Sequence, residues 1–191
     1  MKELNGHFVY HPNKIKLEKF SIQTSKSSIK SKGIAFNYRD LGDLKDFVHA
    51  VRMEGALLPS YLDFKDLSYF VPTLKSIDRT IKISGEVNGT ANDLNINNLK
   101  LAVSDISSFE GDVNFKGLSD LENCLILVNI KNCQTSKIDL ETIRLDKFGF
   151  GKKLSLPVEL ERLGVVKLEG VVDGFYDDFS TNFDISSDNG D

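Results

Sequence analysis

Residues 81–117 read IKISGEVNGTANDLNINNLKLAVSDISSFEGDVNFKG, and this stretch decides the fold. Apolar and polar side chains alternate along it, as where Leu99, Leu101 and Val103 flank Lys100 and Ala102. A period of two places successive side chains on opposite faces of a β-strand. Asn, Asp, Gly and Ser separate the alternating runs and favour tight turns. The stretch therefore predicts an antiparallel meander with one apolar face and one polar face.

Composition excludes several classes of protein. The 191 residues carry a formal net charge of −4, and Lys and Arg are scattered along the chain, so we expect no nucleic-acid partner. The longest apolar run, Leu125 to Val128 after Cys124, is too short to cross a bilayer and fits a buried strand. The first ten residues lack the apolar centre of a signal peptide. We interpret the chain as a fragment of a longer protein.

The chain contains an internal repeat of about eighty residues. Ile15, Leu17, Phe20 and Ile22 have the same spacing as Leu94, Ile96, Leu99 and Leu101. In both sets the parity slips by one between the second and third members, which predicts a bulge at the same place. We place the copies at about residues 15–93 and 94–178, with a third beginning at 179–191. A repeat made mostly of strands indicates a solenoid-like array.

Each copy also contains a short helix-capable segment. These segments begin at Asp66-Leu67, where Asp66 is a possible helix N-cap, and at Asp139-Leu140. A further helical turn is expected in LPVELERLG, which ends at Gly164. The predicted fold is therefore all-β with short helical segments: one elongated, curled antiparallel sheet that encloses a groove.

Catalytic and metal-binding patterns are weak. His7 and His11 would share a strand face, but the sequence places no third metal ligand beside them. The carboxylates fall in turns or on the polar face, which leaves an acid/base pair near Asp177-Asp178 as the weaker alternative. An extended strand would hold Cys124 and Cys133 too far apart for a disulfide, so we expect free thiols. We expect neither enzymatic activity nor a cofactor.

The order and spacing of these motifs resemble the TamB family, the translocation and assembly module subunit within the AsmA-like superfamily. The resemblance rests on residues 66–101, on SSFEGDVNFKGLSDLEN and TSKIDLETI, and on LPVELERLGVVKLEGVVDGFYDDF. It implies a piece of a long periplasmic β-rich body shaped like a taco. It further implies that the parent protein is anchored in the inner membrane and meets an outer-membrane assembly barrel protein, in both cases through parts outside this chain.

The resemblance implies phospholipid transport between the two membranes, with acyl chains held in an apolar groove. The alternation supplies thirteen candidate groove-lining residues: Ile81, Ile83, Val87, Leu99, Leu101, Val103, Phe109, Val113, Phe115, Leu125, Leu127, Val166 and Leu168. The same pattern would also suit a closed core between two halves of the sheet, and the sequence leaves that alternative open. Leu125 and Leu127 are ambiguous because Ile126 and Val128 beside them are apolar too.

Two other functions fit the sequence less well than a lipid conduit. A scaffold could bind client β-strands at an exposed sheet edge during outer-membrane protein assembly and secretion, and such edges could also pair copies of the fragment. A carbohydrate-binding or hydrolytic β-solenoid would need exposed aromatic residues or a carboxylate pair on its polar face. The polar positions are instead Lys, Glu, Asp, Asn and Ser, and the chain has no Trp.

Overall fold

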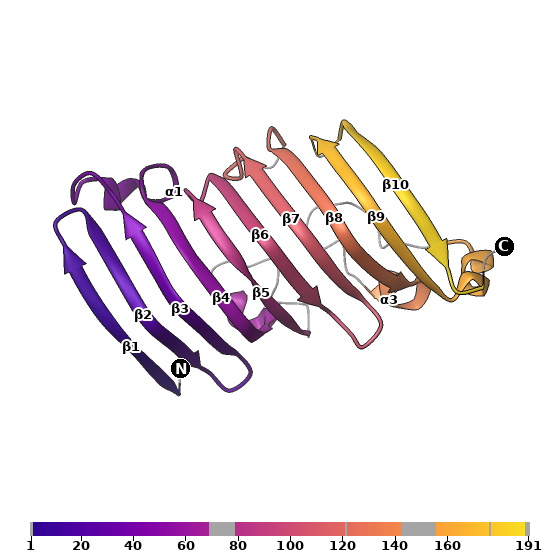
Figure 1. The fold of residues 1–191 in the computed structure, drawn as a ribbon, viewed down its shortest axis with the longest axis horizontal. Helices are drawn as coiled ribbons and strands as arrows, with labels where there is room; N and C mark the ends of the chain where they lie inside the picture. Colours follow the sequence, from indigo (N-terminus) through magenta and orange to yellow (C-terminus); the bar gives the residue numbers. More distant parts are fainter. Residues whose placement is uncertain (1, 69–78, 121, 143–155, 176, 190–191) are drawn as a thin grey trace.

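The computed structural model describes residues 2–68, 79–120, 122–142, 156–175 and 177–189. Ten antiparallel strands form one open sheet in which every strand pairs with its neighbours in the sequence (Figure 1). The strands are β1 (Glu3–His11), β2 (Lys14–Gln23), β3 (Ser28–Asn37), β4 (Arg52–Asp63), β5 (Thr80–Gly89), β6 (Asp93–Ala102), β7 (Ser108–Lys116), β8 (Leu125–Ser136), β9 (Val165–Gly174) and β10 (Phe179–Ser187). At a usual strand spacing the sheet is roughly 43 Å across.

The predicted all-β fold class is confirmed: a repetitive, elongated antiparallel sheet with a few short helices. These helices are η1 (Asp43–Asp46), α1 (Phe47–Ala50), α2 (Phe64–Leu67), α3 (Lys137–Thr142) and η4 (Val158–Leu163). The expected helical turn before Gly164 is η4, a 3-10 helix, and Gly164 follows it with φ of 69°. Within the described ranges, no helix has the length and apolar character needed to span a bilayer.

Residues 81–117 form the predicted meander. They supply β5, β6 and β7, which pair in sequence order. Asn88-Gly89 is not the turn between the first two of these strands but the end of β5, and Gly89 pairs with Leu94. The turn lies at residues 90–92, where the Thr90 Oγ1 accepts a hydrogen bond of 3.0 Å from the backbone N–H of Asp93. That local hydroxyl contact stabilises a turn centred on Ala91 and Asn92.

The predicted bulges occur where the apolar parity slips. Lys19 in β2 and Asn98 in β6 are the described non-glycine residues with positive φ, at 47° and 50°. Each lies between the second and third apolar residues of its copy. The backbone N–H of Asn98 donates a 2.8 Å hydrogen bond to Asp112 Oδ1 on β7, which stabilises the left-handed conformation. The bulges turn the apolar residues on either side of them to the same face of the sheet.

The bulges recur in alternate strands of the sheet. The extra residue lies between Leu57 and Ser60 in β4 and between Ile96 and Leu99 in β6, whereas β5 between them keeps its alternation past Gly85. The extra residue recurs between Ile130 and Cys133 in β8. We refer to β2–β5 as the first unit and to β6–β9 as the second unit. A bulge bends its strand and increases the local twist. The bulges of β2, β4, β6 and β8 lie at one level of the sheet, and we call the line that joins them the crease.

A hydrogen-bonded clasp closes each unit at the same end of the strands. In the first unit Thr24 and Ser27, in the β2–β3 turn, donate to Asp66 Oδ2 of α2 at 2.6 and 2.5 Å. The backbone N–H of Ser27 also donates to Thr24 Oγ1, at 2.7 Å. Ser27 is only 1% exposed, so its hydroxyl needs this partner. The clasp ties the hairpin that begins the unit to the helix that follows its third strand.

The second unit repeats the clasp with the same chemistry. Ser104 and Ser107, in the β6–β7 turn, donate to Asp139 Oδ2 of α3 at 2.5 and 2.6 Å. The backbone N–H of Ser107 donates to Ser104 Oγ at 2.8 Å, as in the first unit. These bonds hold the pKa of both carboxyl groups, Asp66 and Asp139, below the usual range. The Asp-Leu motifs of the sequence therefore mark the clasps.

The prediction that Asp66 caps its helix is wrong. The N-cap of α2 is Asp63, whose side chain accepts a 2.9 Å hydrogen bond from the backbone N–H of Lys65. Asp66 lies within the helix, with its carboxylate turned to the β2–β3 hairpin. Most of the rest of the first predicted helical segment lies at 69–78, outside the described residues.

Replacing Gly170 with Ala should destabilise the sheet by about 2 kcal/mol. Gly170 lies on the crease with φ of 149°, and a Cβ there would collide with the carbonyl oxygen of Asn182. Gly33→Ala is the matched control, because its Cβ would meet only the Leu17 carbonyl oxygen, at 3.4 Å. Urea unfolding measures both free energies. Equal effects of the two substitutions would contradict the constraint at Gly170.

Replacing Asp66 and Asp139 with Asn should remove a pH-dependent part of the stability. Their pKa values are lowered on folding, so the clasps contribute fully above the unfolded pKa, about 3.9, and lose that contribution as pH falls through the lower folded values. The double variant should be less stable at neutral pH and lose less stability on acidification. Asp184→Asn, an exposed change on β10, is the control. Parallel pH curves for all three proteins would contradict the clasp.

Candidate functional site: the apolar face of the sheet

One face of the sheet carries apolar residues on all strands, and we call it the apolar face. On the side of the crease near Gly89, a cross-strand row runs through Val87, Ile96, Val113, Val128 and Val172. Residues that are directly opposite in an antiparallel sheet project from the same face. The row therefore continues unbroken over five strands.

A second row runs on the other side of the crease. It joins Ile83, Leu101, Phe109, Cys133 and Leu168 on the same five strands. Burial raises the pKa of the Cys133 thiol, so this position stays uncharged at neutral pH. Strand β7 alternates regularly from Phe109 to Val113, so these two residues project from the same side of the sheet and both rows belong to one face.

The first unit continues the same face. Leu17 pairs with Ile34, and Ile22 with Ile29, one pair on each side of the crease. Phe8 of β1 lies opposite Leu17. At the far end Ile185 of β10 lies opposite Leu168. The apolar face thus reaches both outer strands of the described sheet.

Register places ten of the thirteen candidate residues along this face. They are Ile81, Ile83, Val87, Leu99, Leu101, Phe109, Val113, Phe115, Val166 and Leu168. Val103 lies just beyond the end of β6, outside the paired residues. The proposed contact of the candidates with lipid stays a prediction.

Leu125 and Leu127 do not join the other candidates. Leu127 lies opposite Asn114 and Asp173, and Leu125 lies opposite Lys116. These partners belong to the polar face, so the assignment of the two leucines to the groove is corrected. Both neighbours in the sequence are apolar as well, and only pairing with β7 and β9 fixes which face each residue takes.

Sequence reasoning missed several residues of the apolar face. The β8 residues Ile126, Val128, Ile130 and Cys133 all project from it, as does Val172 of β9. All four residues from Leu125 to Val128 are apolar, so alternation does not show which of them project from the apolar face. The Lys131-Asn132 pair would have provided a signal, because a polar pair that interrupts an apolar alternation indicates a bulge.

No second sheet covers the apolar face within the described ranges. Ten strands form a single layer, and most candidate residues remain half-buried. Only Ile81, Leu99 and Val113 among the candidates are buried, each 7–9% exposed. A closed core between two packed sheets would bury most of the inward residues. The described part of the chain therefore has an apolar face rather than a two-layer core.

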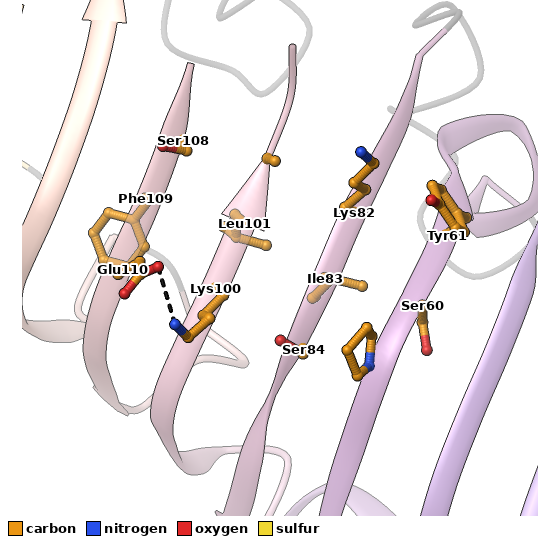
Figure 2. Close-up of a pocket in the computed structure, with 12 residues that line it drawn as sticks. Ser60, Tyr61, Lys82, Ile83, Ser84, Lys100, Leu101, Ser108, Phe109 and Glu110 are labelled. Atoms are coloured by element: carbon orange, nitrogen blue, oxygen red, sulfur yellow. Dashed lines mark hydrogen bonds and ion pairs between the residues drawn. The ribbon is translucent and has the colours of Figure 1, made fainter. Parts of the chain in front are cut away.

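A shallow hollow of about 200 Å³ lies over β4 to β7 beside the crease. Figure 2 shows Ile83, Leu101 and Phe109 at this hollow, each from a different strand. Ser60 at its border is 2% exposed. Apolar side chains line part of the hollow and offer dispersion contacts, and Lys82, Lys100 and Glu110 also border it.

The segment that connects β3 to β4 packs against one end of the first unit. The Phe47 ring of α1 lies 5.8 Å from the Phe36 ring of β3, centroid to centroid. Val51, which follows α1, is fully buried. The segment is held by Asp43, whose carboxylate accepts from the Arg39 guanidinium at 2.9 Å and from its backbone N–H at 2.8 Å. The short helix α1 therefore borders the apolar face at this end.

Paired charges occupy the polar face of the second unit. Lys100 and Glu110 form an ion pair of 3.0 Å, visible as the dashed line in Figure 2. Lys131 Nζ lies 2.8 Å from Asp112 Oδ2 and, with the backbone N–H of Asn98, holds the pKa of that carboxyl below its usual range. Exposed ion pairs of this kind contribute little stability but keep the polar face hydrated.

The weak metal and catalytic candidates are not brought together. His7 faces Glu18 at 3.7 Å, across the β1–β2 pair. Cys124 is buried directly before β8, and Cys133 lies in the apolar face. Neither cysteine forms a disulfide. No group of three His, Cys, Asp or Glu with metal-binding geometry exists among the described residues.

Comparison of the chain with models of known protein families, with curated proteins and with solved structures gives no match.

Proposed function

We propose that this chain is a segment of a conduit that holds phospholipid acyl chains along its apolar face. The observation that carries the proposal is the continuity of that face over ten strands, without a second sheet in the described ranges. Exposed apolar patches of such extent mark binding surfaces in soluble proteins. Each methylene moved from water to this surface gains about 0.8 kcal/mol.

The crease determines the shape of the proposed binding surface. A sheet bent along its long axis becomes a trough, and we propose that the apolar face lines the inside. The ligand lies along the crease, across the strands, where the shallow hollow at Ile83, Leu101 and Phe109 begins. Because the contacts are non-directional, such a trough selects for acyl chains and tolerates sliding.

The resemblance to the TamB family extends this proposal to the parent protein. In that setting the segment lies in the periplasm, within a body anchored in the inner membrane and joined to an outer-membrane assembly barrel protein by other parts. The transported ligand is then phospholipid, and the process is outer-membrane biogenesis. The chain itself contributes the apolar surface and no catalysis.

A second candidate function rests on the sheet edges. β1 and β10 each pair on one side only in the described sheet, and Phe179 and Ile185 of β10 are 61% and 64% exposed. Unpaired strands are templates for β-augmentation by client chains. A scaffold of this kind would bind unfolded β-barrel segments at an edge and would not require lipid.

Photo-crosslinking separates these functions. A photoreactive amino acid at Leu101 or Val128, incubated with radiolabelled phospholipid, should capture lipid, because both positions lie on the apolar face. Lys100 and Leu127, each adjacent on the same strand but on the polar face, are the matched controls. Leu127 is the sharper one, since its side chain is as apolar as that of Val128.

Equal labelling at Leu127 and Val128 would show non-specific lipid adsorption and would overturn the conduit. Absence of lipid at both apolar-face positions, together with adducts to a denatured β-barrel protein at Phe179, would instead favour the scaffold.

A further inference from the structure

The polar face differs in charge between the two units at equivalent positions. Strands β2 and β3 carry five lysines, whereas the matching strands β6 and β7 carry two, Lys100 and Lys116, among acids and amides. The charge reverses at two pairs of positions, Lys14 against Asp93 and Lys30 against Glu110, and it is lost where neutral Asn95 matches Lys16. At the bulge, Lys19 corresponds to Asn98. The apolar residues of the same strands do not change in character.

Strand pairing gathers these lysines into one surface, the basic patch, made up of Lys14, Lys16, Lys19, Lys30 and Lys32. Lys14, Lys16 and Lys30 alternate with apolar-face residues and so project from the polar face. Lys19 and Lys32 lie at the bulge, in the opposing strands β2 and β3. They are separated by up to eighteen positions in the sequence, so the patch exists only in the folded sheet.

Few of the described carboxylates form ion pairs with the lysines of the basic patch. Lys16 pairs with Glu18 at 2.6 Å, and this ammonium holds the pKa of Glu18 below its usual range. Among the described residues no ion pair joins Lys14, Lys30 or Lys32 to a carboxylate. In the second unit, by contrast, Glu110 and Asp112 are paired with Lys100 and Lys131.

The imbalance extends along the whole chain. Residues 1–50 contain nine Lys and Arg against five Asp and Glu, a net charge of +4. Residues 51–191 contain fifteen against twenty-three, a net charge of −8, and the two values sum to the −4 of the chain. β1 and β10 lie at opposite ends of the sheet, so the charge is polarised along its long axis (Figure 1).

We propose that the basic patch docks on an anionic lipid bilayer surface and that the acidic part of the sheet, β4 to β10, points away from it. A sheet face with several exposed lysines matches an array of lipid phosphates, and each Lys near such a surface raises the affinity several-fold. The acidic part of the sheet is repelled by the same surface, which fixes the orientation. A second copy of this chain is a poorer partner, because Glu110 and Asp112 on its polar face are already paired.

This inference concerns the polar face and does not rest on the proposed groove. The probes are vesicles of equal parts phosphatidylcholine and phosphatidylglycerol, and vesicles of phosphatidylcholine alone. In co-sedimentation at low salt, the chain should bind the first and not the second. Lys14→Gln with Lys30→Gln should weaken that binding about tenfold. Added salt should weaken it as well.

The matched control is Lys116→Gln with Lys167→Gln, which removes two lysines from the polar face of β7 and β9, outside the basic patch. It should bind like the unmodified chain, and circular dichroism should show both variants folded. Equal losses in the two variants, or equal binding to both kinds of vesicle, would overturn the proposal. So would a salt-sensitive dimer in sedimentation velocity without vesicle binding, or preferential binding of duplex DNA. Lipid crosslinking at Leu101 tests the apolar face and vesicle binding tests the basic patch. The two experiments therefore show separately which of the two proposals fails.

Discussion

The structure depends on bulges that recur at the same level in alternate strands. A one-residue insertion in a strand exchanges its two faces beyond the insertion. Lys19 and Asn98 take a left-handed conformation at the insertion, while β5 and β7, the strands beside Asn98, keep a regular alternation. If a single strand lacked its bulge, its apolar residues beyond the crease would project into water. Continuity of the apolar face is therefore a cooperative property of the sheet.

The clasps fix the position of a hairpin turn against a short helix in each unit, where the described residues form no two-layer core to hold it. A single-layer sheet buries few side chains completely, so hydrophobic packing alone fixes its ends weakly. Here a carboxylate accepts two hydroxyl hydrogen bonds and converts a loose turn into a defined corner. Thr24 in one unit and Ser104 in the other show that hydroxyl chemistry, rather than residue identity, is what recurs.

The sequence predicts local features well and long-range ones poorly, for a physical reason. Alternation predicts the meander and the positions of the bulges, because both depend on a few neighbouring residues. It does not predict the faces of β8, where Leu125 to Val128 are all apolar and pairing with β7 decides. Nor does it reveal the clasp, since Ser27 and Asp66 are 39 positions apart. The basic patch escapes notice for the same reason, because its lysines gather only when β2 and β3 pair.

The two faces of this sheet vary independently, and that independence bears on function. Between the units the apolar face keeps its character at matching positions, as with Leu17 and Ile96, while the polar face passes from Lys30 to Glu110. Solubility alone requires charge but not a change of its sign along the array. A conduit that runs between two different surfaces must distinguish its ends without interrupting its lining. A sheet with a uniform apolar face and a polarised outer face meets both requirements, because alternate residues of one strand serve each of them.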